Sequence, residues 1–150
     1  MEYSTGSIGR VFTVRLDHGD DILSGIEELA TIENIQAAVF MMLGAARKVN
    51  LVVGPRTNEV PPDPIWKHID DAHEIIGIGN IFQEDGKPKI HLHSAAGKDD
   101  SVNLGCLRKE SEVFMVVEIF IIELCRISAS RVFDAEKGFA PLVFDQGKSV

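Results

Sequence analysis

The chain has 150 residues, the length of one ordinary domain, and 45% of them are apolar, which is enough to build a sizeable core. Its formal net charge of −8 at pH 7 argues against non-specific nucleic-acid binding, which depends on lysine and arginine neutralising phosphates. No basic segment followed by an apolar one opens the sequence, and no apolar run reaches the roughly 18 residues of a membrane span, so we expect a cytoplasmic protein without a membrane partner.

The first third of the chain predicts strands around one helix. Residues 9–16 alternate polar and apolar side chains, which is typical of a half-buried strand. Apolar residues then recur at helical spacing over 22–33, and an aspartate just before them can cap the helix. Residues 35–54 predict two strands around Gly44, and the uninterrupted apolar start indicates a strand covered on both faces.

The remaining two thirds predict a long loop and further strands. Residues 55–71 hold four of the six prolines and are expected to form the loop. Residues 73–82 predict a strand with Gly77 and Gly79 on one face, where another backbone or a ligand can approach closely. Three more strands and a tail that packs across the domain follow, at 89–95, 102–108, 113–124 and 131–145. One helix against six or seven strands predicts an α+β fold with a mainly antiparallel sheet, in a single domain over 1–150.

The strand at 113–124 predicts an oligomer, because it is apolar on both faces. One helix of about three turns cannot cover both faces of such a sheet, so the uncovered face should meet another subunit. Gly77 and Gly79 would permit close backbone approach there. The alternative is that the long loop and the tail cover that face within one chain.

The run KIHLHS predicts a metal site. His91 and His93 share one face of the strand, because side chains two residues apart point the same way. A hairpin that turns at 96–101 and pairs residue 95 with 102 puts Cys106 opposite His91 and diagonal to His93. A slip of one residue would send Cys106 to the other face. Two imidazoles and a thiolate at this spacing suit Zn²⁺ or another divalent transition metal, and three ligands leave a coordination position open.

Other assignments remain open from the pattern alone. A strand histidine is commonly solvated, and a lone cysteine commonly acts as a small buried hydrophobe. The fourth ligand is His73 or water, whereas His18 and His68 are expected to be solvent-exposed in a turn and a loop. Three carboxylates are candidates for a base near the metal, although ion pairing is the commoner role of such groups: Glu74, Glu118 and Glu123.

Five segments, in this order and spacing, resemble one known family. They are GRVFTVRLDHGDDIL, LGAARKVNL, HEIIGIGNI, KIHLHSAAGKDDSVNLGCL and RVFDAEKGFAPL. The family is the plants-and-prokaryotes conserved domain, found in AT-hook nuclear proteins of plants and as single-domain proteins in bacteria and archaea. The resemblance covers about residues 8–143.

The resemblance implies an α+β fold, a homotrimer, and a metal site in which a His-x-His strand pairs with a Gly-Gly-His-Leu strand. The matching residues in this chain are Leu104, Gly105, Cys106 and Leu107. Cys106 therefore stands where the family has its third histidine, which changes the ligand but keeps the ability to bind a metal.

Two functional hypotheses follow. The first is a trimeric metal-binding domain that acts on a small polar molecule, although the sequence predicts neither the substrate nor the reaction. The second is a non-enzymatic module whose trimer presents residues 55–71 and 113–124 to protein partners. A DNA-binding role would be carried over from the plant members, whose Arg-Gly-Arg-Pro hook lies outside the domain and has no counterpart in this sequence.

We therefore expect weak or absent binding of the isolated chain to duplex DNA, because the net charge is −8 and no basic patch is evident. A fluorescence titration at about 0.15 M salt measures this, since non-specific binding has dissociation constants of roughly 10⁻⁴–10⁻⁶ M. A sub-micromolar dissociation constant would contradict the expectation.

Overall fold

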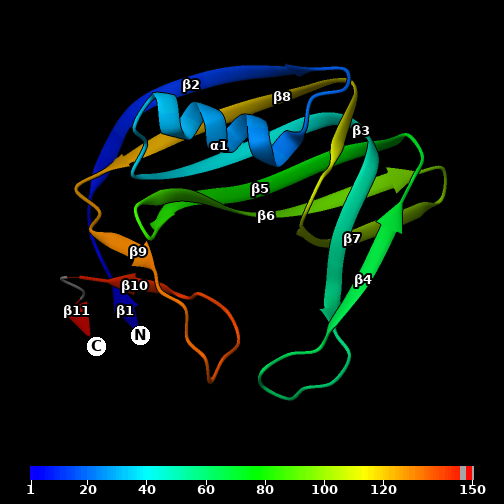
Figure 1. Ribbon diagram of the computed structural model, residues 1–150. Helices are drawn as coiled ribbons and strands as arrows, with labels where there is room; N and C mark the ends of the chain where they lie inside the picture. The colour runs from blue at the N-terminus through cyan, green and yellow to red at the C-terminus, as the bar shows by residue number, and fades with distance from the viewer. Residues whose placement is uncertain (146–147, 150) are drawn as a thin grey trace.

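The structure, a computed structural model, describes residues 1–145 and 148–149. It confirms the α+β class, with one helix on a nine-stranded sheet and a separate two-stranded pairing of the chain ends (Figure 1). The elements are β1 (Glu2–Tyr3), β2 (Ser7–Asp17), α1 (Ile22–Ile32), β3 (Ala37–Pro55), β4 (Pro64–Ile69), β5 (His73–Glu84), β6 (Lys87–Lys98), β7 (Ser101–Leu107), β8 (Glu112–Cys125), β9 (Ala129–Arg131), β10 (Leu142–Phe144) and β11 (Lys148–Ser149). Within the described part of the chain, no helix is long and apolar enough to cross a membrane.

The sheet is mixed and has more strands than the six or seven predicted. Strand β9 runs parallel to β5, with Ser130 beside Gln83, whereas the other pairs are antiparallel. The additional strands lie where prolines and short segments hide the strand pattern. Strand β4 belongs to the predicted long loop and pairs with β3. Strand β10 belongs to the predicted tail, and β9, which pairs with it, ends at the first residue of that tail. Strands that start at a proline are commonly edge strands, as β4 is.

Strand β3 closes part of the sheet into a ring. It is one strand of 19 residues rather than the two predicted around Gly44. Its first half pairs with β5 and β8, and its second half turns sharply and pairs with β4 and β7 (Figure 1). Gly44 permits the bend with φ of +145°, because a Cβ there would lie 2.2 Å from the Val116 carbonyl oxygen. Strands β3, β5, β6 and β7 therefore form a closed circuit.

Helix α1 covers the inner face of the sheet. Asp21 caps it, as predicted, by accepting a hydrogen bond of 2.8 Å from the Ser24 backbone N–H. Its buried stripe consists of Ile22, Ile26 and Ala30. These side chains join a core that every long strand supplies through alternate residues, including Leu16, Phe40, Met42, Leu51, Ile81, Leu92, Leu107, Val117, Ile119 and Ile121.

The two glycines of β5 face this core and not a subunit interface, so that part of the sequence prediction is wrong. A Cβ on Gly79 would lie 2.2 Å from Cζ of Phe40 and 2.8 Å from the His91 carbonyl oxygen. A Cβ on Gly77 would lie 2.9 Å from side-chain atoms of Leu92 and Met42. The glycines thus make room for large side chains on the inner face.

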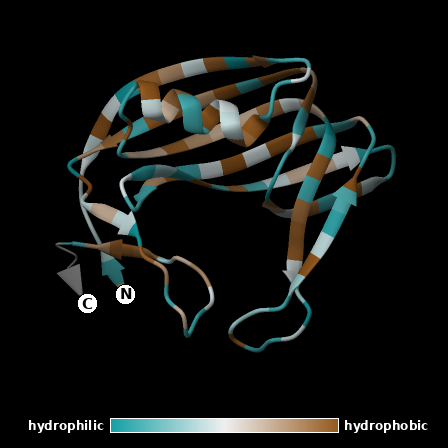
Figure 2. Cartoon of the chain, viewed as in Figure 1, coloured by the Kyte–Doolittle hydropathy of each residue, from teal (hydrophilic) through white to brown (hydrophobic). Residues whose placement is uncertain are grey.

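The outer face of the sheet carries exposed apolar residues, as the pattern of β8 predicted for one face. We define the outer apolar face by residues of β3, β5, β7 and β8: Val39, Met41, Leu43, Ile76, Ile78, Leu104 and Phe120. Apolar residues follow β3 and β8 along much of their length (Figure 2). In the described residues, helix α1 lies on the opposite side, so this face has no helical cover.

Replacing Gly79 with alanine is expected to lower the free energy of unfolding by about 1–3 kcal/mol, because the new methyl group overpacks the site beneath Phe40. Urea unfolding measures the change. Gly97→Ala is the matched control: its Cβ would meet Val102 at an ordinary 3.4 Å, so stability should change by less than about 0.5 kcal/mol. Equal effects in both variants would refute the packing argument.

Candidate metal centre

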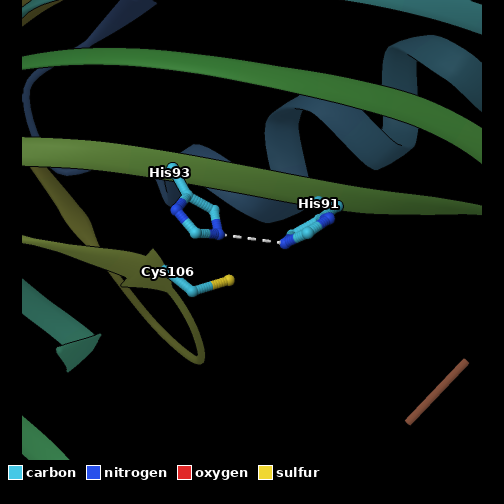
Figure 3. A group of neighbouring side chains, drawn as sticks. All are labelled: His91, His93 and Cys106. Carbon is cyan, nitrogen blue, oxygen red and sulfur yellow. Dashed lines mark hydrogen bonds between the residues drawn. The ribbon is translucent and has the colours of Figure 1, made fainter. Parts of the chain in front are cut away.

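Strand β6 divides its side chains between the core and the candidate site. Ile90 and Leu92 are buried among the core residues, whereas His91 and His93 project from the outer face, as the alternation predicts. Cys106 projects from the neighbouring strand β7 toward the same place (Figure 3). Among the described residues, these three are the one group of histidine, cysteine and carboxylate side chains whose donor atoms converge.

The register of the hairpin differs by two residues from the predicted one. The turn is tighter, with Lys98 paired to Ser101 around Asp99, which has φ of +55°. Cys106 therefore lies directly opposite His93, and His91 takes the diagonal position. A shift of two residues preserves the face of every side chain, so the predicted group still converges.

The separations fit a tetrahedral metal. The Nε2 atoms of His91 and His93 lie 3.2 Å apart, and all three donor atoms lie within 4.8 Å of one another. Zinc bonds of ordinary length and tetrahedral angle put two nitrogens about 3.3 Å apart, and a nitrogen and a sulfur about 3.6 Å apart. The imidazoles are thus already at ligand separation, and the thiol has at most about 1.2 Å to move.

The electrostatics of the site keep His91 neutral. Burial lowers the pKa of His91 to about 4, and Arg131, His93 and Arg108 add to the effect. The ring therefore has a free lone pair at neutral pH. Burial raises the pKa of the Cys106 thiol, whereas nearby Arg108 acts in the opposite direction. The site accordingly holds two imidazoles and a thiol that loses its proton when a metal binds.

Comparison with known proteins identifies the family. The profile of the Plants and Prokaryotes Conserved (PCC) domain matches residues 3–125. The chain belongs to this family. No curated protein matches the chain.

Solved structures of similar proteins have the same fold. A metal-containing protein from Archaeoglobus fulgidus is 30% identical over 95% of this chain and 99% of its own, with a TM-score of 0.84. A plant- and prokaryote-conserved protein from Pyrococcus horikoshii is 26% identical over 99% of this chain and 100% of its own, with a TM-score of 0.83. A putative DNA-binding protein from Bacteroides thetaiotaomicron is 22% identical over 97% of this chain and 100% of its own, with a TM-score of 0.77, and shows the fold alone.

The other histidines of this PCC domain lie away from the cluster. Ile78 of β5 pairs with His93, and His73 is five residues away from Ile78 on the same strand. Along the strand direction, His73 and His93 are therefore about 17 Å apart. His73 instead bonds to the Asp71 carbonyl oxygen at 3.0 Å. His18 is exposed in a turn, as the sequence suggested, and it also accepts the Met115 backbone N–H and packs edge-on against Phe114. His68 bonds to the Asn50 side chain.

The three candidate bases also lie away from the cluster. Glu123 accepts hydrogen bonds from Arg10, which lower the pKa of the Glu123 carboxyl. Glu118 is three strands from β6, a distance of about 14 Å, and Glu74 is about 14 Å along β5 from the level of His93. The commoner interpretation, an ion pair, applies to Glu123.

The sequence interpretation missed two arginines beside the site. Arg131 is the last residue of β9. Its Nη2 lies 3.4 Å from Nδ1 of His91 and 2.7 Å from Oδ1 of Asn80. Arg108 comes directly after the end of β7, two residues beyond Cys106. The strand periodicity therefore puts Arg108 and Cys106 on the same face. That spacing could have revealed Arg108. Nothing local predicts Arg131, because the parallel contact of β9 with β5 joins distant parts of the chain.

Proposed function

We propose that this PCC domain is a metal-binding protein, with His91, His93 and Cys106 as ligands of Zn²⁺ or another divalent transition metal. The observation that carries the proposal is the 3.2 Å approach of the two Nε2 atoms beside the Cys106 thiol. The similar protein from Archaeoglobus fulgidus is described as containing a metal, which supports the proposal without naming the ion. Imidazole and thiolate ligands favour zinc among the common divalent ions.

A site with three protein ligands suits binding or catalysis better than a purely structural role, because a fourth position is left for a small molecule. When bound there, a divalent transition metal polarises a carbonyl or phosphoryl oxygen. His91 and His93 would hold the ion, and burial of Cys106 would limit access of water to the sulfur. With His73 remote from the cluster, a water or a small ligand takes the fourth position in this proposal.

We further propose that the chain works as a homotrimer. The side chains of the outer apolar face are between 37% and 67% exposed on neighbouring strands. Monomers seldom carry contiguous apolar patches above a few hundred Å², so a second subunit is the cover that we expect for this face. A groove of about 510 Å³ crosses this face and includes Ile76, Ile78, Leu104 and Phe120 in its lining. His93 also lines it, so a second subunit on this face would lie next to the metal centre.

The second candidate function is a non-enzymatic interaction module. The observation in its favour is the same outer apolar face, which could receive a different protein. Metal content separates the two candidates: one metal per chain favours the first, and a metal-free chain with intact assembly favours the second.

Replacing His93 with alanine should abolish stoichiometric zinc, with affinity falling more than about 100-fold, since even outer partners of ligands are worth 10- to 100-fold. Metal analysis after dialysis measures the ratio, which should be one zinc per chain in the wild type. The melting temperature of the metal-free proteins should agree closely, because His93 projects from the core.

His73→Ala is the matched control for that variant, since it removes a histidine from the neighbouring strand without touching the cluster. It should retain one zinc per chain. Full zinc occupancy in His93→Ala would refute the ligand assignment.

Light scattering at micromolar concentration should give three times the 16.5 kDa of one chain. Ile78→Lys should reduce this mass, because it places a charge at a side chain that is 67% exposed on the outer apolar face. Ile32→Lys is the control, since Ile32 is 70% exposed at the end of α1 on the other side of the sheet. A wild-type mass of one chain would refute the assembly, and a dimer mass would refute the trimer alone.

A further inference from the structure

A positively charged cavity adjoins the candidate metal centre. It has a volume of about 360 Å³, within the ordinary range of small-ligand pockets, and His91 forms part of its wall. Three cationic side chains line it: Lys89, Arg108 and Arg131. Phe133 and Phe139, from the segment between β9 and β10, supply an apolar side.

The charges in this cavity are poorly compensated, although the chain as a whole carries −8. The one carboxylate in the lining, Glu84, lies 3.6 Å from the Lys89 ammonium. Neither Arg108 nor Arg131 forms an ion pair with any described residue. A negatively charged ligand would neutralise this local excess of positive charge.

Arg131 is built into the wall rather than free in solvent. Its Nη1 donates to the Ala140 carbonyl oxygen at 3.0 Å, and its Nη2 donates to Oδ1 of Asn80 at 2.7 Å. Its Nε is buried and has no hydrogen-bond partner among the described residues. The guanidinium is therefore held in one orientation and still has unused donor capacity.

Metal binding would leave one more donor without an acceptor. If His91 binds a metal through Nε2, its Nδ1 carries the ring proton. A metal-binding histidine ordinarily donates this second N–H to a carboxylate, a carbonyl or water. Nδ1 of His91 faces Nη2 of Arg131 at 3.4 Å, so two donors would point at each other.

We infer that this cavity binds a small organic oxyanion, with its charged group between Arg108, Arg131 and the N–H of His91 and its apolar part against Phe133 and Phe139. One oxyanion would accept from the donors that otherwise lack a partner. The inference rests on the proposed function for the state of His91, whereas the two arginines line the cavity with or without a metal. Carboxylates and phosphates share this chemistry, and the size and aromatic lining favour a carboxylate with a ring or short chain.

Calorimetric titration of the full chain with sodium benzoate tests the inference. The titration is run on zinc-loaded protein and on protein stripped with a chelator, with the zinc ratio measured on the same samples. Acetate and inorganic phosphate are titrated in parallel. We expect saturable benzoate binding that is tighter in the zinc-loaded protein and tighter than acetate binding.

Arg108→Gln should weaken benzoate binding at least about tenfold, because it removes one charged hydrogen-bond donor from an exposed position. Arg15→Gln is the matched control: it removes the same charge from β2, where Arg15 pairs with Asp17, and should leave the affinity unchanged. Both variants are compared with the wild type after zinc loading, with the zinc ratio measured on each sample.

The outcomes separate this inference from the metal proposal. Zinc uptake without saturable binding of any probe up to about 10 mM, or binding that Arg108→Gln leaves unchanged, overturns the inference and spares the metal site. Benzoate binding that depends on Arg108 in a chain without zinc uptake supports the anion pocket and overturns the metal proposal. Phosphate binding tighter than benzoate binding supports an oxyanion site and overturns the choice of a carboxylate.

Discussion

The pairing of β7 on both of its edges is the constraint on which the candidate site depends. Cys106 lies opposite His93 of β6 on one side and opposite Val52 of β3 on the other. The bend of β3 past Gly44 brings Val52 to this place, so a residue far from the site determines where the thiol sits. Because backbone ladders fix both neighbours, the position of Cys106 does not rely on any contact among the ligands themselves.

The two faces of the sheet have separate roles. The inner face, with α1, buries the apolar residues and supplies the stability of the fold. The outer face carries His91, His93 and the exposed apolar side chains in adjoining rows, since Ile78 pairs with both Met41 and His93. Assembly through that face and binding at the cluster would therefore share one surface, while the core behind them stays unchanged.

The sequence predicted what depends on local alternation and missed what depends on distant contacts. The shared face of His91 and His93 follows from strand periodicity, and Cys106 kept its face because the register error was an even number of residues. The glycines of β5 were misplaced because isoleucines occupy both faces of that strand, and contacts across the core, such as that of Gly79 with Phe40, determine which face is inside. Arg131 was out of reach because its position depends on a single parallel contact across the fold.

The alternation of β6 and β7 also bears on how such a site can evolve. The residues between the ligands, Leu92 among them, hold the strand in the core, whereas each ligand projects from the opposite face. A change of donor, such as cysteine for histidine, can therefore alter which metals the site prefers without disturbing the packing. The metal preference of the site can thus evolve independently of the stability of the core, according to the ions that a cell makes available.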